Sequence, residues 1–296
     1  MGRSRPVRFE RFGGAVVLFR DAEGTARALD DRCPHRGASL AAGRVVGGCI
    51  ECPFHGFQFD GDGTCTVLPA HGDEPIPAAM RAPAYATKEA HGLIWMWRGD
   101  GDPVGEPSFF DVLADGFSYA ELTSRWHTHY TRAVENQLDF THLPFVHRTS
   151  IGRGMAPRVE VEMDVSPSHI RAWLAGNGPK VAVEWRAPNV WTLELSPTLV
   201  QFLAFIPVDE THTDLLCRAY QRQVRIPGIR ALYDWVSVQT NRWILGQDQA
   251  VVETQRPYEA QLGMAELLVP SDSPITEYRR IRHRASKTKK RLDVAV

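Results

Sequence analysis

The sequence lacks long apolar runs, an excess of basic residues and a secretion signal. No window reaches about 18 consecutive apolar residues, so the sequence predicts no membrane span. Its 34 Lys and Arg residues against 35 Asp and Glu give a formal net charge of -1, which argues against a dedicated nucleic-acid binder. The apolar run after the basic N-terminus is too short for a signal peptide, so we expect a cytoplasmic protein. The composition, 43% hydrophobic and 23% charged residues, is that of a globular chain.

Two further absences concern cofactors. The five cysteines are a sparse set, and Cys and His that cluster in a reducing compartment more often bind a metal than form disulfides. None of the Gly-containing stretches GDGDPVG, GNGPKV and GRGMAP matches the dinucleotide fingerprint G-x-G-x-x-G. The sequence therefore favours metal chemistry without a nucleotide bound by this chain.

The length of 296 residues allows two domains. The first part of the chain contains short apolar segments separated by Gly, Pro and Asp, which predicts a small all-β domain. A stretch rich in Gly, Pro and acidic residues, from residue 99 to residue 107, is typical of a linker. We therefore expect one domain over residues 1–100 and a second over residues 101–296.

The second domain changes from strand to helix patterning along its length. Apolar residues alternate with others in residues 159–165, 181–185 and 200–206. This period of two predicts an antiparallel sheet. Helical spacing from Ile229 to Gln261 predicts one long helix near the C-terminus, and we expect a shorter helix near residues 130–143.

Two short segments each pair one cysteine with one histidine. Cys33-Pro34-His35 is followed by Cys52-Pro53-Phe54-His55, and a glycine comes shortly after each segment. A Rieske [2Fe-2S] cluster needs two Cys on one iron and two His on the other, which two such loops can supply. A structural zinc site would also accept four Cys and His ligands, but zinc sites usually pair Cys with Cys. The spacing favours the Rieske cluster.

A second group of polar side chains lies in residues 135–147. Asp139 and His142 stand three residues apart and would share one face of a helix. His147 could reach the same metal as His142 only if the helix ended between them, and Pro144 supplies such a break. Two His and one carboxylate with open positions suit a ferrous iron that activates O2. Each of these residues alone could also belong to an ordinary surface helix.

The third metal ligand must lie elsewhere, and the long helix offers Asp248. Its carboxylate would project from an apolar stripe with Ile244, Val251 and Val252, where a charge is costly unless it is paired or metal-bound. Glu253, the nearest competitor, is expected at the solvated surface. A salt bridge to an inward-facing Arg is the alternative for Asp248.

Together these segments resemble the large subunits of Rieske-type non-haem iron oxygenases, closest to the vanillate O-demethylase branch. The resemblance lies in CPHRGA at 33–38, CPFHGF at 52–57, the N-x-x-D-x-x-H-x-x-x-x-H pattern within 126–152, and GQDQAVVETQRP at 246–257. It implies a [2Fe-2S] cluster on Cys33, His35, Cys52 and His55, and a mononuclear Fe(II) on His142, His147 and Asp248. It also implies that Asp139 bridges an iron-ligating His to the His55 position of a neighbouring subunit. Asn136, in the same signature, is a further catalytic candidate.

The resemblance implies an α+β fold in which an all-β Rieske [2Fe-2S] domain precedes a helix-grip catalytic domain, an antiparallel sheet with a long C-terminal helix. The implied activity is O2-dependent monooxygenation, either hydroxylation or oxidative O- or N-demethylation of a small to medium aromatic or cyclic substrate. A cis-dihydroxylating ring dioxygenase would use the same ligands. A Rieske electron carrier without oxygenase chemistry and a zinc-stabilised lipid-binding module are further alternatives.

The resemblance also implies partners. Electrons from NAD(P)H would arrive only through a separate flavin or ferredoxin-type reductase, and O2 would be the co-substrate. A head-to-tail homotrimer would bring the cluster of one subunit close to the iron of the next. We expect neither a nucleic-acid nor a membrane partner. The first expected strand begins at Ala15, earlier than is usual in the family.

The substrate pocket and the C-terminal tail are less sharply indicated. Phe202 and Ile206 could supply an apolar wall and Trp243 an aromatic surface, although core packing explains each equally well. Asn241 lies seven residues before Asp248, on the same expected helix face, and is a candidate polar contact for the substrate. The basic residues of segment 279–291 predict a solvated helix end or a disordered extension.

Overall fold

The chain divides into two compact units. The computed structural model describes residues 5–99, 101, 103, 105–113, 116–176, 178, 181–287 and 294–295. The first unit spans Met1–Pro107 with Leu292–Val296, and the second spans Ser108–Arg291. The division after Pro107 lies at the end of the Gly- and Pro-rich stretch that predicts a linker, of which residues 100, 102 and 104 lie outside the described part.

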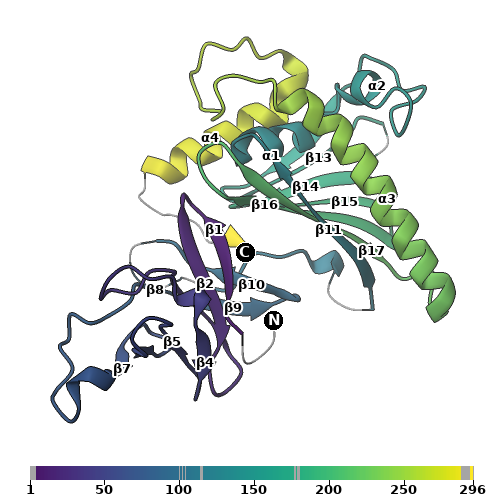
Figure 1. Cartoon of the computed structure of the whole chain (residues 1–296). Helices are drawn as coiled ribbons and strands as arrows, with labels where there is room; N and C mark the ends of the chain where they lie inside the picture. The colour runs from purple at the N-terminus through teal and green to yellow at the C-terminus, as the bar shows by residue number, and fades with distance from the viewer. Residues whose placement is uncertain are drawn as a thin grey trace. The chain divides into compact units, whose positions relative to one another are not determined.

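The first unit consists of three small antiparallel sheets (Figure 1). One sheet has the order β1-β2-β3-β8, with β1 (Val7–Arg11), β2 (Gly14–Arg20), β3 (Ala26–Asp30) and β8 (Ala84–Tyr85). Another has the order β4-β5-β6-β7, with β4 (Arg44–Val46), β5 (Cys49–Glu51), β6 (Gln58–Phe59) and β7 (Cys65–Val67). The third has the order β18-β10-β9, with β9 (Thr87–Ala90), β10 (Leu93–Met96) and β18 (Val294–Ala295). Two short 3-10 helices are η1 (Leu40–Ala42) and η2 (Pro69–His71).

Strand β2 organises the core of this unit because both of its faces are buried. Val17 and Phe19 pack with Leu29 in a larger apolar cluster. Val16 and Leu18 point to the other face and join a smaller one. The packed sheets leave the connections after β3 and β5 at the surface, and these connections carry the two Cys-His segments.

The second unit is built on one seven-stranded antiparallel sheet with the order β11-β17-β16-β15-β14-β13-β12. Its strands are β11 (Ser118–Trp126), β12 (Val161–Val165), β13 (His169–Leu174), β14 (Ala182–Arg186), β15 (Val190–Ser196), β16 (Leu199–Pro207) and β17 (Thr213–Gln221). The β16 and β17 strands pair without a break from Leu199 with Gln221 to Pro207 with Thr213. Every residue of β17 is buried, as expected for an inner strand covered on both faces.

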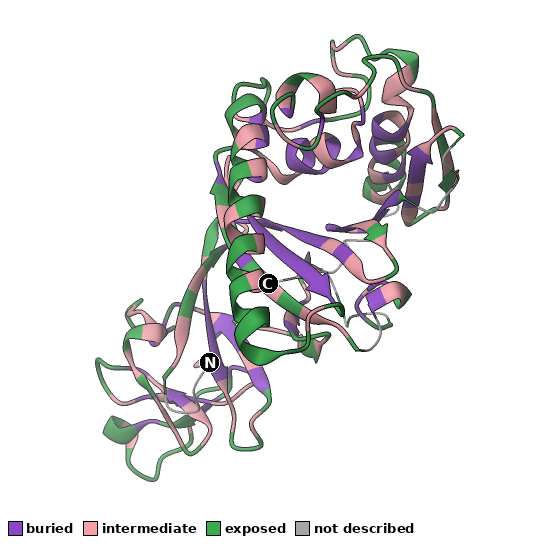
Figure 2. Cartoon of the chain, turned by 90° about the vertical axis from the view of Figure 1, so that its right-hand side faces the viewer, coloured by how far each residue is buried: buried purple, intermediate pink, exposed green. Residues whose placement is uncertain are grey.

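Helices cover one face of this sheet (Figure 1). They are α1 (Tyr130–Leu138), α3 (Pro227–Val252) and α4 (Ser273–Lys287). The short helix α2 (Leu143–Val146) and the 3-10 helices η3 (Asp111–Leu113) and η5 (Pro270–Asp272) lie in the connecting segments. Residues of α1, α3 and α4 form one core cluster with the sheet residues Leu203, Phe205 and Cys217. Figure 2 shows that α3 buries only one side and exposes the other. The predicted α+β organisation, sheets followed by a sheet with a long helix, is confirmed.

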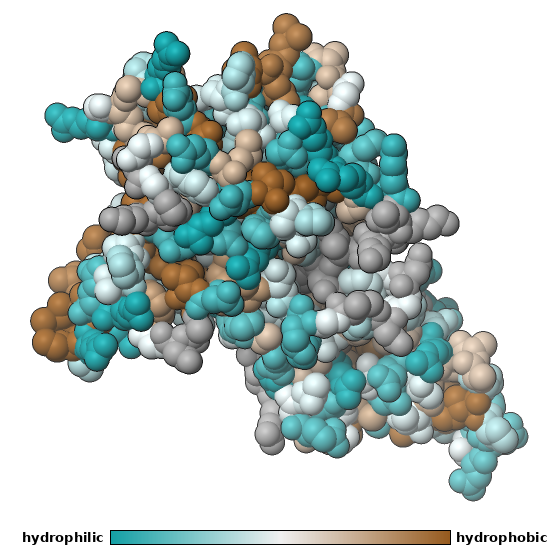
Figure 3. All heavy atoms as spheres, turned by 180° about the vertical axis from the view of Figure 1, so that it is seen from behind, coloured by the Kyte–Doolittle hydropathy of each residue, from teal (hydrophilic) through white to brown (hydrophobic). Residues whose placement is uncertain are grey.

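The exposed side of α3 is apolar at its N-terminal end. Ile229, Leu232 and Trp235 are 56%, 63% and 60% exposed. Hydrophobic side chains gather there at the left edge of Figure 3. Within the described residues, every helix falls short of the length or the apolarity that crossing a bilayer requires.

The structure corrects the predicted end of the long helix and refines the prediction for the basic segment. The long helix ends at Val252 instead of near Gln261, and Pro257 could not have continued it because proline has no N-H for the helical hydrogen bond. The basic segment from residue 279 forms the end of α4 up to Lys287, and Arg280 and Arg284 are exposed, as expected for a solvated helix end. Its first residue is the exception. Arg279 is 4% exposed and pairs with Glu135 at 2.6 Å. Residues 288–293 lie outside the described part.

Two candidate metal centres

The first Cys-His loop is held by backbone hydrogen bonds and by one buried carboxylate. The amide of Cys33 donates to the Ala38 carbonyl at 2.8 Å, and the amide of Gly37 donates back to Cys33 at 2.9 Å. The Ser39 hydroxyl donates to the carboxylate of Asp31 at 2.7 Å. Gly37 has φ +74°, a conformation that favours glycine. The loop therefore turns tightly around Cys33.

The second loop repeats this geometry. The amide of Cys52 donates to Phe57 at 2.8 Å, and the amide of Gly56 donates back to Cys52 at 3.1 Å. Gly56 has φ +72°, which nearly equals that of Gly37. Two loops of the same sequence pattern thus adopt the same turn and present the same two side chains.

The four candidate cluster ligands lie together. Cys33 and Cys52 are buried and form no disulfide. The ring centroids of His35 and His55 are 4.7 Å apart. Burial raises the pKa of the Cys33 thiol to about 11, and the neighbouring Cys52 raises it as well, so the Cys33 thiol ionises readily only with a bound metal. Two thiols and two imidazoles so placed fit a Rieske cluster.

The histidine edge of this site faces solvent. His35 and His55 are exposed, and Phe54 beside them is 56% exposed. Phe57 stacks on His35 with a centroid distance of 4.9 Å, and the Arg36 guanidinium lies over the Phe54 ring at 5.3 Å. An exposed, partly apolar edge is suited to transient contact with a protein that exchanges electrons.

The second centre forms where the chain leaves α1. That helix ends at Leu138, and Asp139 is extended, with φ -89° and ψ 126°. His142 and His147 flank α2 as its N-cap and C-cap, and Pro144 lies in its first turn. The expected placement of Asp139 and His142 on one helix face is therefore wrong. The helix breaks before Asp139, and Pro144 starts a short helix instead of ending a long one.

Three side chains distant in sequence meet at this point. Ligand atoms of His142, His147 and Asp248 all lie within 4.8 Å of one another. The Asp248 Oδ1 atom is 2.9 Å from His147 Nε2 and 3.4 Å from His142 Nε2. The side chains of His147 and Asp248 are 1% and 3% exposed. Two imidazole nitrogens and one carboxylate oxygen converge in a buried place, which is a donor set suited to Fe(II).

The structure distinguishes two acidic residues, Asp248 in α3 and Glu253 just after its C-terminal end. Within the described residues, no Lys or Arg pairs with Asp248, whose stripe on α3 is shared with buried Leu245 and Val252. Glu253 is not merely solvated, because its carboxylate accepts the backbone N-H of His127 at 2.7 Å. Of these two acidic residues, Asp248 and not Glu253 contacts His142 and His147.

The charges at the centre stabilise one another. Burial alone would lower the pKa of His142, but the carboxylates of Asp139 and Asp248 raise it to about 9. Burial would raise the pKa of Asp248, but the two histidines lower it to about 2. Asp248 Oδ1 and His142 Nδ1 are buried, and although Asp248 Oδ1 lies close to both imidazoles, neither atom has a well-aligned hydrogen bond within the described residues. A divalent cation would satisfy the carboxylate oxygen, so the residues present fit a metal ion.

Asp139 lies at the rim of this centre. Its Oδ1 accepts the Thr141 amide at 2.6 Å and the Thr141 hydroxyl at 2.7 Å. Its Oδ2 is 3.6 Å from His142 Nδ1, and its side chain is 23% exposed. Burial would raise the pKa of Asp139, but His142 and Thr141 lower it, so the carboxylate is ionised at neutral pH. The neighbouring candidate Asn136 has a buried amide nitrogen without a partner within the described residues.

Three further residues support the ligands, and the sequence patterns did not single them out. Gln247 Oε1 lies 2.8 Å from His147 Nδ1 and 2.8 Å from the Ser150 hydroxyl. Gln137 Nε2 lies 3.5 Å from Asp248 Oδ2. Gln247 adjoins Asp248, and Gln137 occupies a variable position of the signature between Asn136 and Asp139. Neither position gives a sequence signal of its own.

The expected pocket residues are distributed over different surfaces. Phe202 packs against Phe109 at 5.3 Å between centroids. Phe202 and Ile206 alternate with Leu203 and Phe205, which belong to the cluster under α3, so they point to the opposite face of the sheet. The alternation in the sequence showed that Phe202 and Ile206 lie on the same face of the sheet. It could not show whether the helices cover that face.

The two α3 candidates also differ from each other. Trp243 is 52% exposed on the outer side of the helix. Asn241 is half-buried and lies seven residues before Asp248 in α3, about two helical turns away on the same side. Its contact with a substrate stays a prediction.

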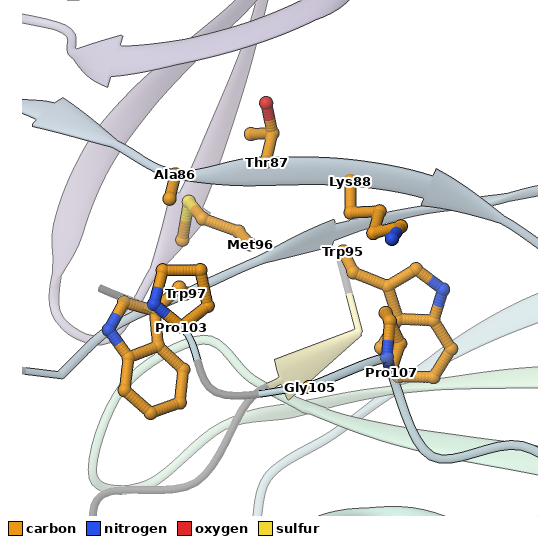
Figure 4. A pocket seen from close by; sticks show the side chains of 9 residues that line it. All are labelled: Ala86, Thr87, Lys88, Trp95, Met96, Trp97, Pro103, Gly105 and Pro107. Atoms are coloured by element: carbon orange, nitrogen blue, oxygen red, sulfur yellow. The ribbon is translucent and has the colours of Figure 1, made fainter.

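A separate small pocket lies in the first unit (Figure 4). Its volume is about 180 Å³, and its lining residues are Ala86, Thr87, Lys88, Trp95, Met96, Trp97, Pro103, Gly105 and Pro107. In Figure 4 the side chains of Trp97 and Pro103 lie next to each other. No candidate metal ligand lines this pocket, so it takes no direct part in either centre.

Comparisons with known proteins agree with this geometry. Residues 1–83 match the Rieske [2Fe-2S] domain, and residues 126–288 match the vanillate O-demethylase oxygenase C-terminal domain. The chain is 33% identical over 171 residues to the oxygenase component of dicamba O-demethylase from Stenotrophomonas maltophilia, covering 56% of this chain and 50% of that protein. It is 32% identical over 210 residues to the oxygenase component of chloroacetanilide N-alkylformylase from Rhizorhabdus wittichii, covering 62% of this chain and 59% of that protein.

The fold is similar to that of solved structures over nearly the whole chain. NdmA of Pseudomonas putida CBB5 superposes with a TM-score of 0.83 at 24% identity, covering 96% of this chain and 86% of that chain. The chain spans about half the length of the curated relatives it matches. The two matched domains together take up most of the sequence. This protein therefore belongs to the family of Rieske oxygenase large subunits whose C-terminal domain is of the vanillate O-demethylase type.

Proposed function

We propose that this chain is the oxygenase component of a multicomponent monooxygenase that hydroxylates an aromatic or cyclic substrate or removes an O- or N-methyl group. The observation that carries this proposal is the convergence of His142, His147 and Asp248 within 4.8 Å in a chain that also has a Rieske domain. A protein that only carries electrons needs the Rieske cluster but not a second, buried set of metal ligands. The donor set favours O2 activation by Fe(II) over a structural role.

Each chain would hold one [2Fe-2S] cluster and one mononuclear Fe(II). Cys33, His35, Cys52 and His55 are the residues proposed to hold the cluster, and His142, His147 and Asp248 those proposed to hold the iron. When bound, the cluster supplies electrons and the iron supplies O2 activation. The protein would keep water away from the iron, because His147 and Asp248 are almost fully buried.

The overall reaction balances with one O2. For an aryl methyl ether, O2, two electrons and two protons give the phenol, formaldehyde and water. One oxygen atom enters the substrate methyl group and the other leaves as water. The electrons would come from NAD(P)H through a separate flavin or ferredoxin-type reductase, since two relatives are named as the oxygenase components of larger systems.

Asp139 is proposed to connect the two kinds of centre between neighbouring subunits of a homotrimer. Its Oδ2 faces His142, and its side chain is still 23% exposed, so it is accessible to a histidine from outside. His55 on the exposed edge of the Rieske site supplies such a histidine. A carboxylate between two metal-bound imidazoles would fix both tautomers and shorten the electron path.

The relatives suggest which substrates to try. Their names refer to dicamba O-demethylation and to chloroacetanilide N-dealkylation, and a solved structural neighbour is NdmA with caffeine. We therefore propose a methyl ether or N-alkyl group on a ring-containing molecule. Asn241, half-buried on the iron side of α3, is a proposed polar contact for that ring.

The test compares iron content and EPR of the wild type, His142→Ala and His283→Ala, purified anaerobically with and without dithionite. We expect about three irons per chain in the wild type and about two in His142→Ala, with the reduced Rieske signal in both. His283 is exposed on α4, so His283→Ala should keep all three. Two irons per chain in every protein, even after ferrous iron is added back, would contradict the mononuclear site and indicate an electron carrier. Zinc bound in place of iron would contradict both centres.

A further inference from the structure

Gln247 makes an unusual contact beside the second centre. Its side-chain Oε1 is 2.8 Å from His147 Nδ1 and 2.8 Å from the Ser150 hydroxyl. Ligand histidines more often direct the free ring nitrogen to a carboxylate, a backbone carbonyl or water. Here a neutral amide of α3, adjacent to the ligand Asp248, takes that place.

The chemistry of His147, Gln247 and Ser150 determines which atoms donate hydrogen bonds and which atom accepts them. His147 Nε2 lies 2.9 Å from Asp248 Oδ1 and faces the other ligand atoms, so a metal bound there requires that nitrogen to be unprotonated. The proton must then reside on Nδ1, which needs an acceptor. The amide oxygen of Gln247 accepts it, and the Ser150 hydroxyl donates to the same oxygen. Two donors therefore converge on one acceptor and hold its orientation.

Backbone hydrogen bonds hold His147 and Ser150, the two residues that contact Gln247 Oε1. His147 is 1% exposed, and its carbonyl accepts the Ser150 amide at 2.9 Å and the Gly152 amide at 3.0 Å. Ser150 therefore contacts both the backbone of His147 and the side chain that orients its ring. A ring rotation of His147 would break the Gln247 contact and leave a buried N-H without a partner, which is costly.

We propose that Gln247 is a positioning residue that selects the Nδ1-H tautomer of His147 and aims its Nε2 at the mononuclear iron. This inference rests on the proposed function, because it presupposes that His147 binds that iron. Gln247 would act through His147 and touch neither substrate nor metal. Because the amide is neutral, it would orient His147 without giving the imidazole the extra negative character that a carboxylate partner gives.

The experiment measures the affinity for ferrous iron directly on the full chain with its cluster loaded. The mononuclear iron is removed with a chelator, Fe(II) is titrated back anaerobically against a coloured chelator, and the ferrous-nitrosyl EPR signal reports the ligand geometry. The variants are Gln247→Met, which removes the acceptor at similar volume, and Gln247→Glu, which retains an acceptor. Gln249→Ala is the matched control, because Gln249 bonds to the Arg125 carbonyl and to Glu253, away from the ligands.

We expect Gln247→Met to weaken iron binding about 10- to 100-fold and to broaden the nitrosyl signal. The thermal unfolding midpoint should also fall below that of the control, because the buried N-H of His147 loses its acceptor. Gln247→Glu should recover most of the affinity. Equal affinities in Gln247→Met, Gln249→Ala and the wild type would overturn the inference, as would a loss of thermal stability without a change in affinity. If the wild type itself binds no mononuclear iron, the proposed function is wrong. That result differs from failure of the Gln247 inference alone, in which the wild type and Gln247→Met bind iron equally well.

Discussion

The chain contains the sequence D-x-T-H twice, and the two copies form nearly the same turn in different surroundings. In residues 139–142 the Thr141 amide donates to the Asp139 carboxylate at 2.6 Å, and in residues 209–212 the Thr211 amide donates to the Asp209 carboxylate at 2.7 Å. The threonine hydroxyls repeat this bond at 2.7 and 3.0 Å. Local side-chain bonds of this kind depend only on a few consecutive residues.

What differs is the tertiary environment of the histidine. His142 is brought against Asp248 and His147, whereas His212 lies near the surface and stacks on His127 with a centroid distance of 4.7 Å. The first turn therefore belongs to a candidate metal centre, and the second is a loop between β16 and β17. The comparison shows that the local motif makes the turn and that the helices around it give the turn a function.

The largest expected difference between the two turns is in activity. Asp139→Asn should reduce product formation about 100-fold or more, because the amide cannot hold the charge that links His142 to the cluster of a neighbouring subunit. Iron content and the reduced Rieske signal should stay at the wild-type level. Asp209→Asn alters the matched turn and should leave turnover unchanged, measured as the rate of product formation with the reductase in excess. Equal turnover in both variants would show that Asp139 only builds a turn.

The next prediction removes support from α1, which leads into the first turn. Arg279 binds Glu135 through two contacts at 2.6 and 3.0 Å, and both side chains are buried. It also binds the partly exposed Glu266 at 2.7 Å. Arg279→Met should lower the free energy of unfolding of the second unit by about 3 kcal/mol, at the low end for breaking a buried pair because Arg132 still contacts Glu135. Chemical denaturation measures this loss.

The neighbouring exposed residue provides the control for that variant. Arg280 has a side chain that is 54% exposed, and its ion pair with Glu277 is at the surface. Arg280→Met should therefore cost less than about 1 kcal/mol. If the two variants were equally stable, the buried network would contribute nothing to holding α1 and the first turn.

A third prediction tests the loop that follows the first turn. A Cβ atom on Gly152 would lie 1.8 Å from the Leu143 carbonyl oxygen, so Gly152→Ala must displace the backbone next to His142. We expect a loss of about 1–3 kcal/mol in stability together with weaker ferrous iron binding. Gly228→Ala, where no atom lies within 4 Å of the added Cβ, should be neutral in both measurements. Full iron binding by Gly152→Ala would show that the loop can yield without moving the ligands.

The smallest effect concerns the pH response of the second turn. Burial would raise the pKa of Asp209, but hydrogen bonds from Thr211 and His212 lower it below its usual 3.8. Because the folded-state pKa is lowered, the stability from this turn is present above pH 3.8 and is lost as the pH falls through the lower folded value. Exchange of the Thr211 amide should therefore accelerate only in strong acid. Acceleration already near neutral pH would show that the Asp209 carboxylate does not hold the turn.

The sequence predicted the local features of both centres. The two Cys-His loops lie on consecutive turns with the same hydrogen bonds, so spacing within residues 33–55 was enough to place all four candidate ligands. Asp248 was identified because a carboxylate within an apolar helix stripe is costly without a cation. The structure brings it to the two histidines, although its buried neighbours are Leu245 and Val252.

Features that depend on long-range packing were missed or misplaced. The period of two could not tell which face of β16 lies under the helices, so Phe202 and Ile206 were expected on the wrong side. The burial of Arg279 at the start of the basic segment was missed, because its partner Glu135 lies 144 positions away in sequence. The early end of α1 was missed because Pro144, a few residues later, was the stronger local signal.

The amino-acid sequence by itself determined the turns, the strand and helix types, the candidate ligands and the family, because each depends on a few residues close along the chain. Tertiary structure alone decided that His142 and not His212 meets Asp248, and that Gln247 rather than a carboxylate lies beside His147 Nδ1. The physical reason is that a buried charge or N-H must find its partner wherever packing places one, and packing joins residues that are a hundred positions apart.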